Sequence, residues 1–219
     1  MNELLFFAHI GIITLFTIVA LKISKETLVT TVGIYCILAN LFVLKQIKLF
    51  GLQPTASDAF SVGAILGLNL LQEYFGEKIT KKAIWTCFFA LVLYAVVSHI
   101  HLLYIPSVCD ISAGHYNFIL KSMPRIAIAS ILVTLLVQHI DRIFYGFLKQ
   151  KFHNKYFLAR NLLSLFIIQL IDTILFTFAG LWGIVNNLWD IILVSFIVKL
   201  VTILVSVPMV AIFKPKTRI

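Results

Sequence analysis

Long apolar runs dominate this sequence, and each is close to the length that a helix needs to cross a bilayer. A membrane-spanning helix requires about 20 mostly apolar residues, because an α-helix rises only about 1.5 Å per residue. Seven runs meet this requirement: residues 4–21, 27–44, 57–76, 83–105, 122–147, 160–184 and 187–213. The connections between them are short, apart from 106–121. The pattern predicts an all-α fold, a polytopic membrane helix bundle that forms a single domain over residues 1–219.

The composition agrees with a membrane protein and argues against most soluble classes. The chain has 219 residues, of which 61% are hydrophobic and 12% charged, whereas about 25% of a soluble domain is charged. Its net charge of +9 comes from short basic clusters between the apolar runs, which is typical of membrane topology and not of nucleic-acid binding. The first run lacks a basic start and a small-residue cleavage site, so we expect a retained span and not a signal peptide.

The distribution of basic residues predicts the orientation in the membrane. With the N-terminus outside, the outer connections contain only Lys45, Lys48 and Lys121. The inner connections and the C-terminal tail then contain Lys22, Lys25, Lys78, Lys81, Lys82, Lys149, Lys151, Lys155, Arg160, Lys214, Lys216 and Arg218. Because Lys and Arg accumulate on the cytoplasmic side, we predict an N-outside, C-inside topology. This arrangement needs an odd number of spans, which agrees with seven.

Several polar side chains interrupt the apolar runs at similar depths. A charge at the centre of a bilayer costs about 2.5–3.5 kcal/mol even on the permissive insertion scale, so such groups must pair or line a cavity. Asp172 and Lys199 both fall near mid-membrane, where they form either a structural ion pair or part of a binding site. The candidate substrate-binding residues are Asn69, Gln138, Gln169, Asp172 and Lys199.

Other polar residues are expected to have gating or structural roles. Asn40 is predicted to bond between helices. Glu73 lies one helical turn nearer the cytoplasm than the central groups, where it either gates the protein or anchors the basic connection 77–82. Asp141 and Arg142 are predicted to pair at the inner interface, because arginine can extend its charge towards the headgroups. The residues in this class are Asn40, Glu73, Arg125 and Asp141.

Two features of the third run concern its packing and its start. Gly63 and Gly67 in the sequence GAILG form a small-xxx-small pair, which permits close contact between helices. Ser57 and Asp58 are interpreted as an N-terminal cap of that helix. Pro124 is expected at the start of the fifth helix, where its missing N–H costs little.

Motifs for catalysis and for metal binding are missing from the sequence. It contains no HExxH, Walker or G-x-S-x-G pattern, so metalloprotease, ATPase and serine-hydrolase chemistry lack support. His99, His101 and His115 have no carboxylate or cysteine partners at ligand spacing, and the three cysteines have no metal spacing. We therefore expect a protein that is not an enzyme and that has no cofactor and no metal.

A set of motifs in order along the chain resembles one family of transporters. They are Ala39-Asn40-Leu-Phe-Val-Leu-Lys45, N-x-x-x-E-Y-F-G-E-K-x-x-K-K-A-I-W from Asn69 to Trp85, Met123-Pro-Arg125-Ile-Ala with Gln138-x-x-Asp141, Gln169-Leu-Ile-Asp172-Thr173, and Lys199. Together they resemble the queuosine-precursor transporter family, a group of vitamin-uptake-transporter-like integral membrane proteins. The resemblance covers about residues 35–213. The additional N-terminal span resembles the longer branch of the family, with a six-helix core plus one extra helix.

The resemblance implies a function and a location. Family members import 7-deazaguanine bases, namely queuine and its cyano and aminomethyl precursors, across the bacterial inner (cytoplasmic) membrane. Partners would be the small-molecule substrate and membrane lipid, with no nucleic acid, while an energising partner and homo-oligomerisation stay open. So do two alternatives, a substrate-capture subunit of an ATP-energised vitamin-type system and an intramembrane enzyme. Eight positions match the family's polar signature: Asn69, Glu73, Arg125, Gln138, Asp141, Gln169, Asp172 and Lys199.

The chemistry of such a base predicts roles for the central residues. Many family members have Asp where this chain has Asn69, so a proton-coupling role at that position is not expected here. A deazaguanine is planar and has a donor–donor–acceptor edge, which carboxylate and amide groups recognise. We expect Asp172 to bind the guanidine-like edge, with Gln169, Gln138 and Asn69 supplementing it. Lys199 would bind the carbonyl or hold Asp172.

Overall fold

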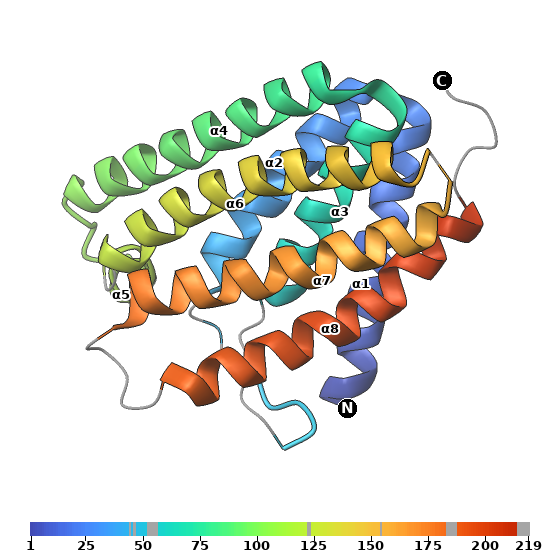
Figure 1. The fold of residues 1–219 in the computed structure, drawn as a ribbon. Coiled ribbons are helices and arrows are strands. Elements are labelled where there is room, and N and C mark those ends of the chain that lie inside the picture. The colour runs from blue at the N-terminus through green and yellow to red at the C-terminus, as the bar shows by residue number, and fades with distance from the viewer. Residues whose placement is uncertain are drawn as a thin grey trace.

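Helices make up the secondary structure of the described chain (Figure 1). The computed structural model describes residues 1–43, 45, 47–51, 57–121, 124–153, 155–182 and 188–213. The elements are α1 (Asn2–Ile23), α2 (Lys25–Phe42), α3 (Asp58–Phe75), α4 (Glu77–Leu103), α5 (Ala113–Lys121), α6 (Pro124–Lys151), α7 (Phe157–Phe176), a π-helical turn η1 (Thr177–Leu181) and α8 (Leu188–Phe213). The prediction of an all-α bundle is confirmed.

The long helices follow the apolar runs, with three local differences. Gly76, at φ 85° and ψ 171°, separates α3 from α4 by a single residue, in a conformation that glycine adopts without a steric penalty. As a result α4 begins at Glu77, well before the predicted residue 83. The connection 106–121 contains the nine-residue helix α5. The α7 helix ends in the π-helical turn η1.

Five helical stretches within the described residues are long and apolar enough to cross a membrane: Asn2–Ile23, Glu77–Leu103, Ile131–Lys151, Phe157–Gly180 and Ile192–Ile212. The other two long helices, α2 and α3, have 18 residues each. Helix α3 is more polar, because it contains Asp58, Asn69, Gln72 and Glu73. These features define a multi-pass helical membrane protein.

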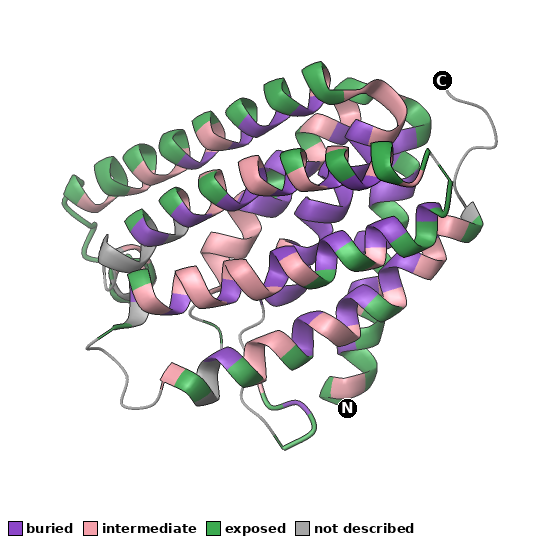
Figure 2. Ribbon diagram, in the orientation of Figure 1, coloured by how far each residue is buried: buried purple, intermediate pink, exposed green. Residues whose placement is uncertain are grey.

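Helix α3 is the centre of the bundle. Fourteen of its 18 residues are buried, and it packs against α1, α2, α4, α6, α7 and α8. Figure 2 shows that helices at the periphery of the bundle, such as α4, are buried on one side and exposed on the other. Their exposed sides include large apolar residues such as Phe16, Phe89 and Leu132. Because α3 is covered by protein, it can have polar side chains that a lipid-facing helix would not tolerate.

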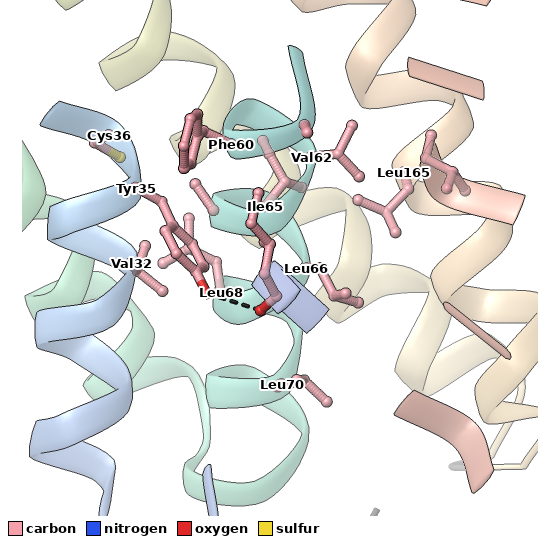
Figure 3. Close-up of a cluster of buried hydrophobic side chains, with 14 of the residues drawn as sticks. Val32, Tyr35, Cys36, Phe60, Val62, Ile65, Leu66, Leu68, Leu70 and Leu165 are labelled. Atoms are coloured by element: carbon pink, nitrogen blue, oxygen red, sulfur yellow. Dashed lines mark hydrogen bonds between the residues drawn. The ribbon is translucent and has the colours of Figure 1, made fainter. Parts of the chain in front are cut away.

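Close packing of α3 against α1 and α2 depends on the two glycines of GAILG. A Cβ atom on Gly63 would lie 2.6 Å from Ile13 Cγ2, and one on Gly67 would lie 2.5 Å from Val32 Cγ2. Figure 3 shows this region, in which side chains of α2 and α3 interlock. Tyr35 of α2 adds a polar link to α1, since its hydroxyl donates to Ile13 O at 2.7 Å. The Gly63 and Gly67 pair therefore permits close helix packing within the bundle.

Candidate functional site

A cavity of about 110 Å³ lies among α2, α3, α6, α7 and α8. Its apolar lining includes Ile65, Val133 and Phe176, while polar groups come from every one of these five helices. The predicted site residues that line the cavity are Asn40, Gln138, Gln169, Asp172 and Lys199. Three helices, α6, α7 and α8, thus bring the side chains predicted for substrate binding to one place, with the exception of Asn69.

The ion pair between α7 and α8 is the main charged feature of the cavity. Lys199 Nζ lies 2.6 Å from Asp172 Oδ2 and donates to Thr173 Oγ1 at 3.1 Å. The lysine side chain is 6% exposed and that of the aspartate 19%. Mutual neutralisation allows both charges to lie inside the bundle. Because both residues line the cavity, the pair is also positioned to contact a ligand.

Two glutamines contribute amide groups to the cavity. The side chain of Gln169 is fully buried, and its Oε1 and Nε2 atoms have no hydrogen-bond partner among the described residues. Gln138 donates from Nε2 to Cys36 Sγ at 3.3 Å, which is a weak acceptor. A buried amide without partners costs about 1–3 kcal/mol. A ligand with complementary donors and acceptors would remove that cost.

Asp58 also lines the cavity, a role that the sequence did not reveal. It is 5% exposed, and its Oδ2 atom has no partner within the described chain. The predicted cap is not observed, because Ser57 makes no side-chain capping hydrogen bond. A signal was present in the sequence: Asp58 precedes Asn69 by 11 residues, about three helical turns, so both lie on one face of α3.

The remaining central residues are placed as follows. Asn69 is fully buried but does not line the cavity, and its amide atoms have no partner among the described residues. Asn40 Nδ2 donates to Cys36 O of its own helix at 3.0 Å, where an interhelical bond was expected. The side chain of Arg125 lies outside the part of the chain that the structure describes.

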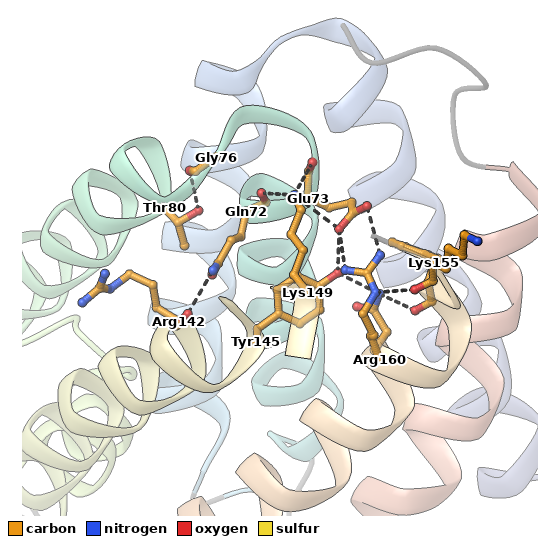
Figure 4. A network of polar contacts seen from close by, with 11 residues as sticks. Gln72, Glu73, Gly76, Thr80, Arg142, Tyr145, Lys149, Lys155 and Arg160 are labelled. Atoms are coloured by element: carbon orange, nitrogen blue, oxygen red, sulfur yellow. Dashed lines mark hydrogen bonds and ion pairs between the residues drawn. The ribbon is translucent and has the colours of Figure 1, made fainter. Parts of the chain in front are cut away.

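Glu73 belongs to a separate cluster, at the C-terminal end of α3 (Figure 4). Its carboxylate receives two hydrogen bonds from Arg160, at 2.9 Å from Nη1 and 3.2 Å from Nη2. The Tyr145 hydroxyl donates to Glu73 Oε2 at 3.2 Å, and Lys149 Nζ lies 3.5 Å from the same oxygen. The cluster thus joins α3 to α6 and α7.

The partners of Glu73 differ from those expected. Of the two roles considered for Glu73, anchoring the basic connection 77–82 would have paired it with Lys81 or Lys82. Its ion-pair partners in the structure are Arg160 and Lys149 instead. The Arg160 side chain is 0% exposed, and its Nε donates to Lys155 O at 2.8 Å. An arginine at the start of a helix is expected at the surface, so this burial could not be predicted from sequence patterns.

Asp141 is buried and does not form the predicted pair with Arg142, so that prediction is wrong. Asp141 is 1% exposed and accepts a hydrogen bond from Ser164 Oγ at 2.6 Å. Arg142 instead forms a hydrogen-bonded ion pair with Glu77 at the start of α4. Adjacent residues point about 100° apart around a helix, so one faces α7 while the other faces α4.

Within the described residues, no group of three or more His, Cys, Asp and Glu side chains is arranged to hold a metal ion. The polar groups of the cavity are amides, carboxylates, hydroxyls and one ammonium group. Such a set can bind a small polar molecule by hydrogen bonds and charge.

A multi-pass helical membrane protein with a polar cavity among its helices has the construction of a transporter. Residues 55–213 match the protein family described as "Putative vitamin uptake transporter". A relative from Bacillus subtilis (strain 168), described as "Probable queuosine precursor transporter", is 31% identical over 188 residues, which are 84% of this chain and 82% of the relative. The chain belongs to this family of transporters and is not an enzyme. No solved structure is significantly similar to it.

Proposed function

We propose that the protein imports queuosine precursors, that is, 7-deazaguanine bases such as queuine and its cyano and aminomethyl precursors. The observation that carries the proposal is the buried Gln169 amide, which lacks partners among the described residues and lines the same cavity as the Asp172–Lys199 pair. The name of the Bacillus subtilis relative supports the same substrate class.

The cavity groups match the hydrogen-bonding edge of such a base. A carboxylate accepts from the amino group and ring N–H of a guanine-like edge, and an ammonium donates to its carbonyl. Asp172 takes the first role, Lys199 the second, and the amides of Gln169 and Gln138 complete the set. The ring of Phe176 also lines the cavity, and aromatic rings stack on planar ligands. Asn69 does not line the cavity and is left out of this binding set.

The proposed topology has all seven long helices crossing the bacterial inner membrane, with the N-terminus outside and the C-terminus inside. An 18-residue helix is about 27 Å long, close to the hydrocarbon thickness of about 30 Å. The cavity is lined by Asn40 near the end of α2, Asp58 at the start of α3 and Asp172 late in α7. In this topology all three lie in the outer half of the membrane. The cavity would therefore receive substrate from outside.

The test uses bacterial cells that cannot make or import 7-deazaguanines. Expression of the wild-type protein should restore queuosine in tRNA when a precursor is supplied, and Asp172→Asn should strongly reduce the initial uptake of the labelled base. Asp110→Asn is the matched control, because Asp110 lies in the exposed outer connection and does not line this cavity. Protein levels in the membrane are measured for each variant. Undiminished uptake by a stably expressed Asp172→Asn protein would refute the binding scheme.

A further inference from the structure

The charges around the cavity do not balance. Among the described residues, the charged side chains that line it are Asp58, Asp172 and Lys199. Lys199 forms its ion pair with Asp172 at 2.6 Å. Asp58 forms no ion pair with another described residue, although its charge interacts with those of both Lys199 and Asp172. Two carboxylates thus share one ammonium group.

The ionised form of Asp58 lacks a counter-charge among the described residues. This residue is 5% exposed, so water does not screen it effectively, and its buried Oδ2 atom has no hydrogen-bond partner within the described chain. Leaving a buried carboxylate without a counter-charge is strongly unfavourable. The neighbouring Asp172 carboxylate adds repulsion. Among the described residues that line the cavity, none supplies the missing charge.

We infer that Asp58 forms a subsite for a protonated amine, so that the cavity selects a planar base with an ammonium arm over a neutral base of the same shape. This inference rests on the proposed function and deepens it. The base would lie against Gln169, Asp172 and Lys199, with its arm directed to Asp58. An ammonium group donates up to three hydrogen bonds, and Oδ2 of Asp58 accepts one of them. Ser61, one turn along α3, also lines the cavity and provides a hydroxyl acceptor.

A proton bound to Asp58 would balance the charge equally well, and this alternative makes a different prediction. A protonated Asp58 is neutral and would give the aminomethyl base no electrostatic advantage over the cyano base. The two bases share the ring system and differ in the arm, which is a primary amine in one and an uncharged nitrile in the other. Primary amines are protonated near neutral pH. Comparing these bases therefore isolates the contribution of the charge.

The experiment measures the affinity of the purified full-length protein in nanodiscs for the aminomethyl and cyano 7-deazaguanine bases at neutral pH. We expect the wild type to bind the aminomethyl base at least ten times more tightly. Asp58→Asn should abolish this preference, while its affinity for the cyano base stays within a factor of three. Asp58→Glu keeps the charge and should keep the preference. Comparison of the two variants therefore distinguishes the loss of the charge from a folding defect caused by substitution at this position. Asp110→Asn is the control outside the cavity and should resemble the wild type.

The outcomes separate the two proposals. Equal affinity of the wild type for the two bases, or a loss in Asp58→Asn that is equal for both, overturns the ammonium subsite and leaves the proposed function intact. Failure of the wild type to bind either base, together with failure to restore queuosine in cells, overturns the proposed function itself. Selective loss of the aminomethyl base in Asp58→Asn supports the subsite.

Discussion

Replacing Glu73 by glutamine should destabilise the bundle strongly, because it removes the charge partner of a fully buried arginine. The Arg160 side chain is 0% exposed and that of Glu73 is 14% exposed. Breaking a buried ion pair by removing one partner costs about 3–5 kcal/mol. Glutamine retains one oxygen that can accept a hydrogen bond from Arg160, so the expected loss is at the lower end, about 3 kcal/mol.

The chain offers a matched control four residues later. Glu77 pairs with Arg142, but the Glu77 side chain is 66% exposed. Exposed ion pairs contribute about 0.2–1 kcal/mol, so Glu77→Gln should reduce the free energy of unfolding by less than about 1 kcal/mol. Both variants exchange the same carboxylate for the same amide within one turn of chain. The difference between them measures the effect of burial.

The assay is reversible unfolding of the purified protein in mixed detergent micelles by SDS titration, followed by circular dichroism. Equal losses for Glu73→Gln and Glu77→Gln would refute the argument that burial of Arg160 makes the Glu73 pair essential. Transport is measured on the same variants. A Glu73→Gln protein that keeps its stability but loses uptake would show that the cluster acts as a gate and not as an anchor.

Three further predictions concern packing, the buried aspartate and the topology. Gly67→Ala should destabilise the protein by about 1–3 kcal/mol through overpacking, whereas Gly33→Ala, which has no atom within 4 Å of the added Cβ, should be neutral or stabilising in the same unfolding assay. Asp141→Asn retains an oxygen that accepts from Ser164 and should change stability by less than about 1.5 kcal/mol, so a larger loss would indicate that the ionised form is required. A membrane-impermeant maleimide should label Cys109, the exposed cysteine, in intact spheroplasts, and labelling only after lysis would refute the N-outside topology.

Much of the fold could be predicted because apolar length is a local property of the sequence. The seven long helices, α1 to α4 and α6 to α8, follow runs that a bilayer would require. The start of α4 was misplaced because its first turns contain charged residues. A prediction that relies on apolar residues leaves such charged turns out of the helix. The nine-residue α5 was missed for a similar reason, since it is shorter than a span. The length of a bilayer span therefore predicts neither the start of α4 nor the presence of α5.

Residues of the candidate site could be predicted only where a similar depth in the membrane is enough to bring two side chains together. Asp172 and Lys199 belong to consecutive antiparallel helices at similar depth, and they form the ion pair that was considered from the sequence. Asp58 and Arg160 lie near the ends of their helices, where sequence patterns indicate a cap and a surface charge, respectively. Their burial depends on which neighbouring helices cover those ends. That information is tertiary. The sequence places Asp58 on the same face of α3 as Asn69, but the burial of Asp58 and Arg160 could not be predicted from it.

The cavity and the Glu73 cluster are mechanically connected because the same two helices contribute to both. Helix α3 carries Asp58 and Glu73, which are about 22 Å apart along its axis, and α7 carries Asp172 and Arg160, about 18 Å apart. A shift of α3 relative to α7 that separates Glu73 from Arg160 would also move Asp58 relative to Asp172, if the helices move as stiff bodies. A ligand that contacts Asp58 and Asp172 together therefore favours some arrangements of these helices over others. Such differential binding is the physical requirement for alternating access. We expect α3 to move together with α1 and α2, because it packs closely against Ile13 and Val32 at its two glycines.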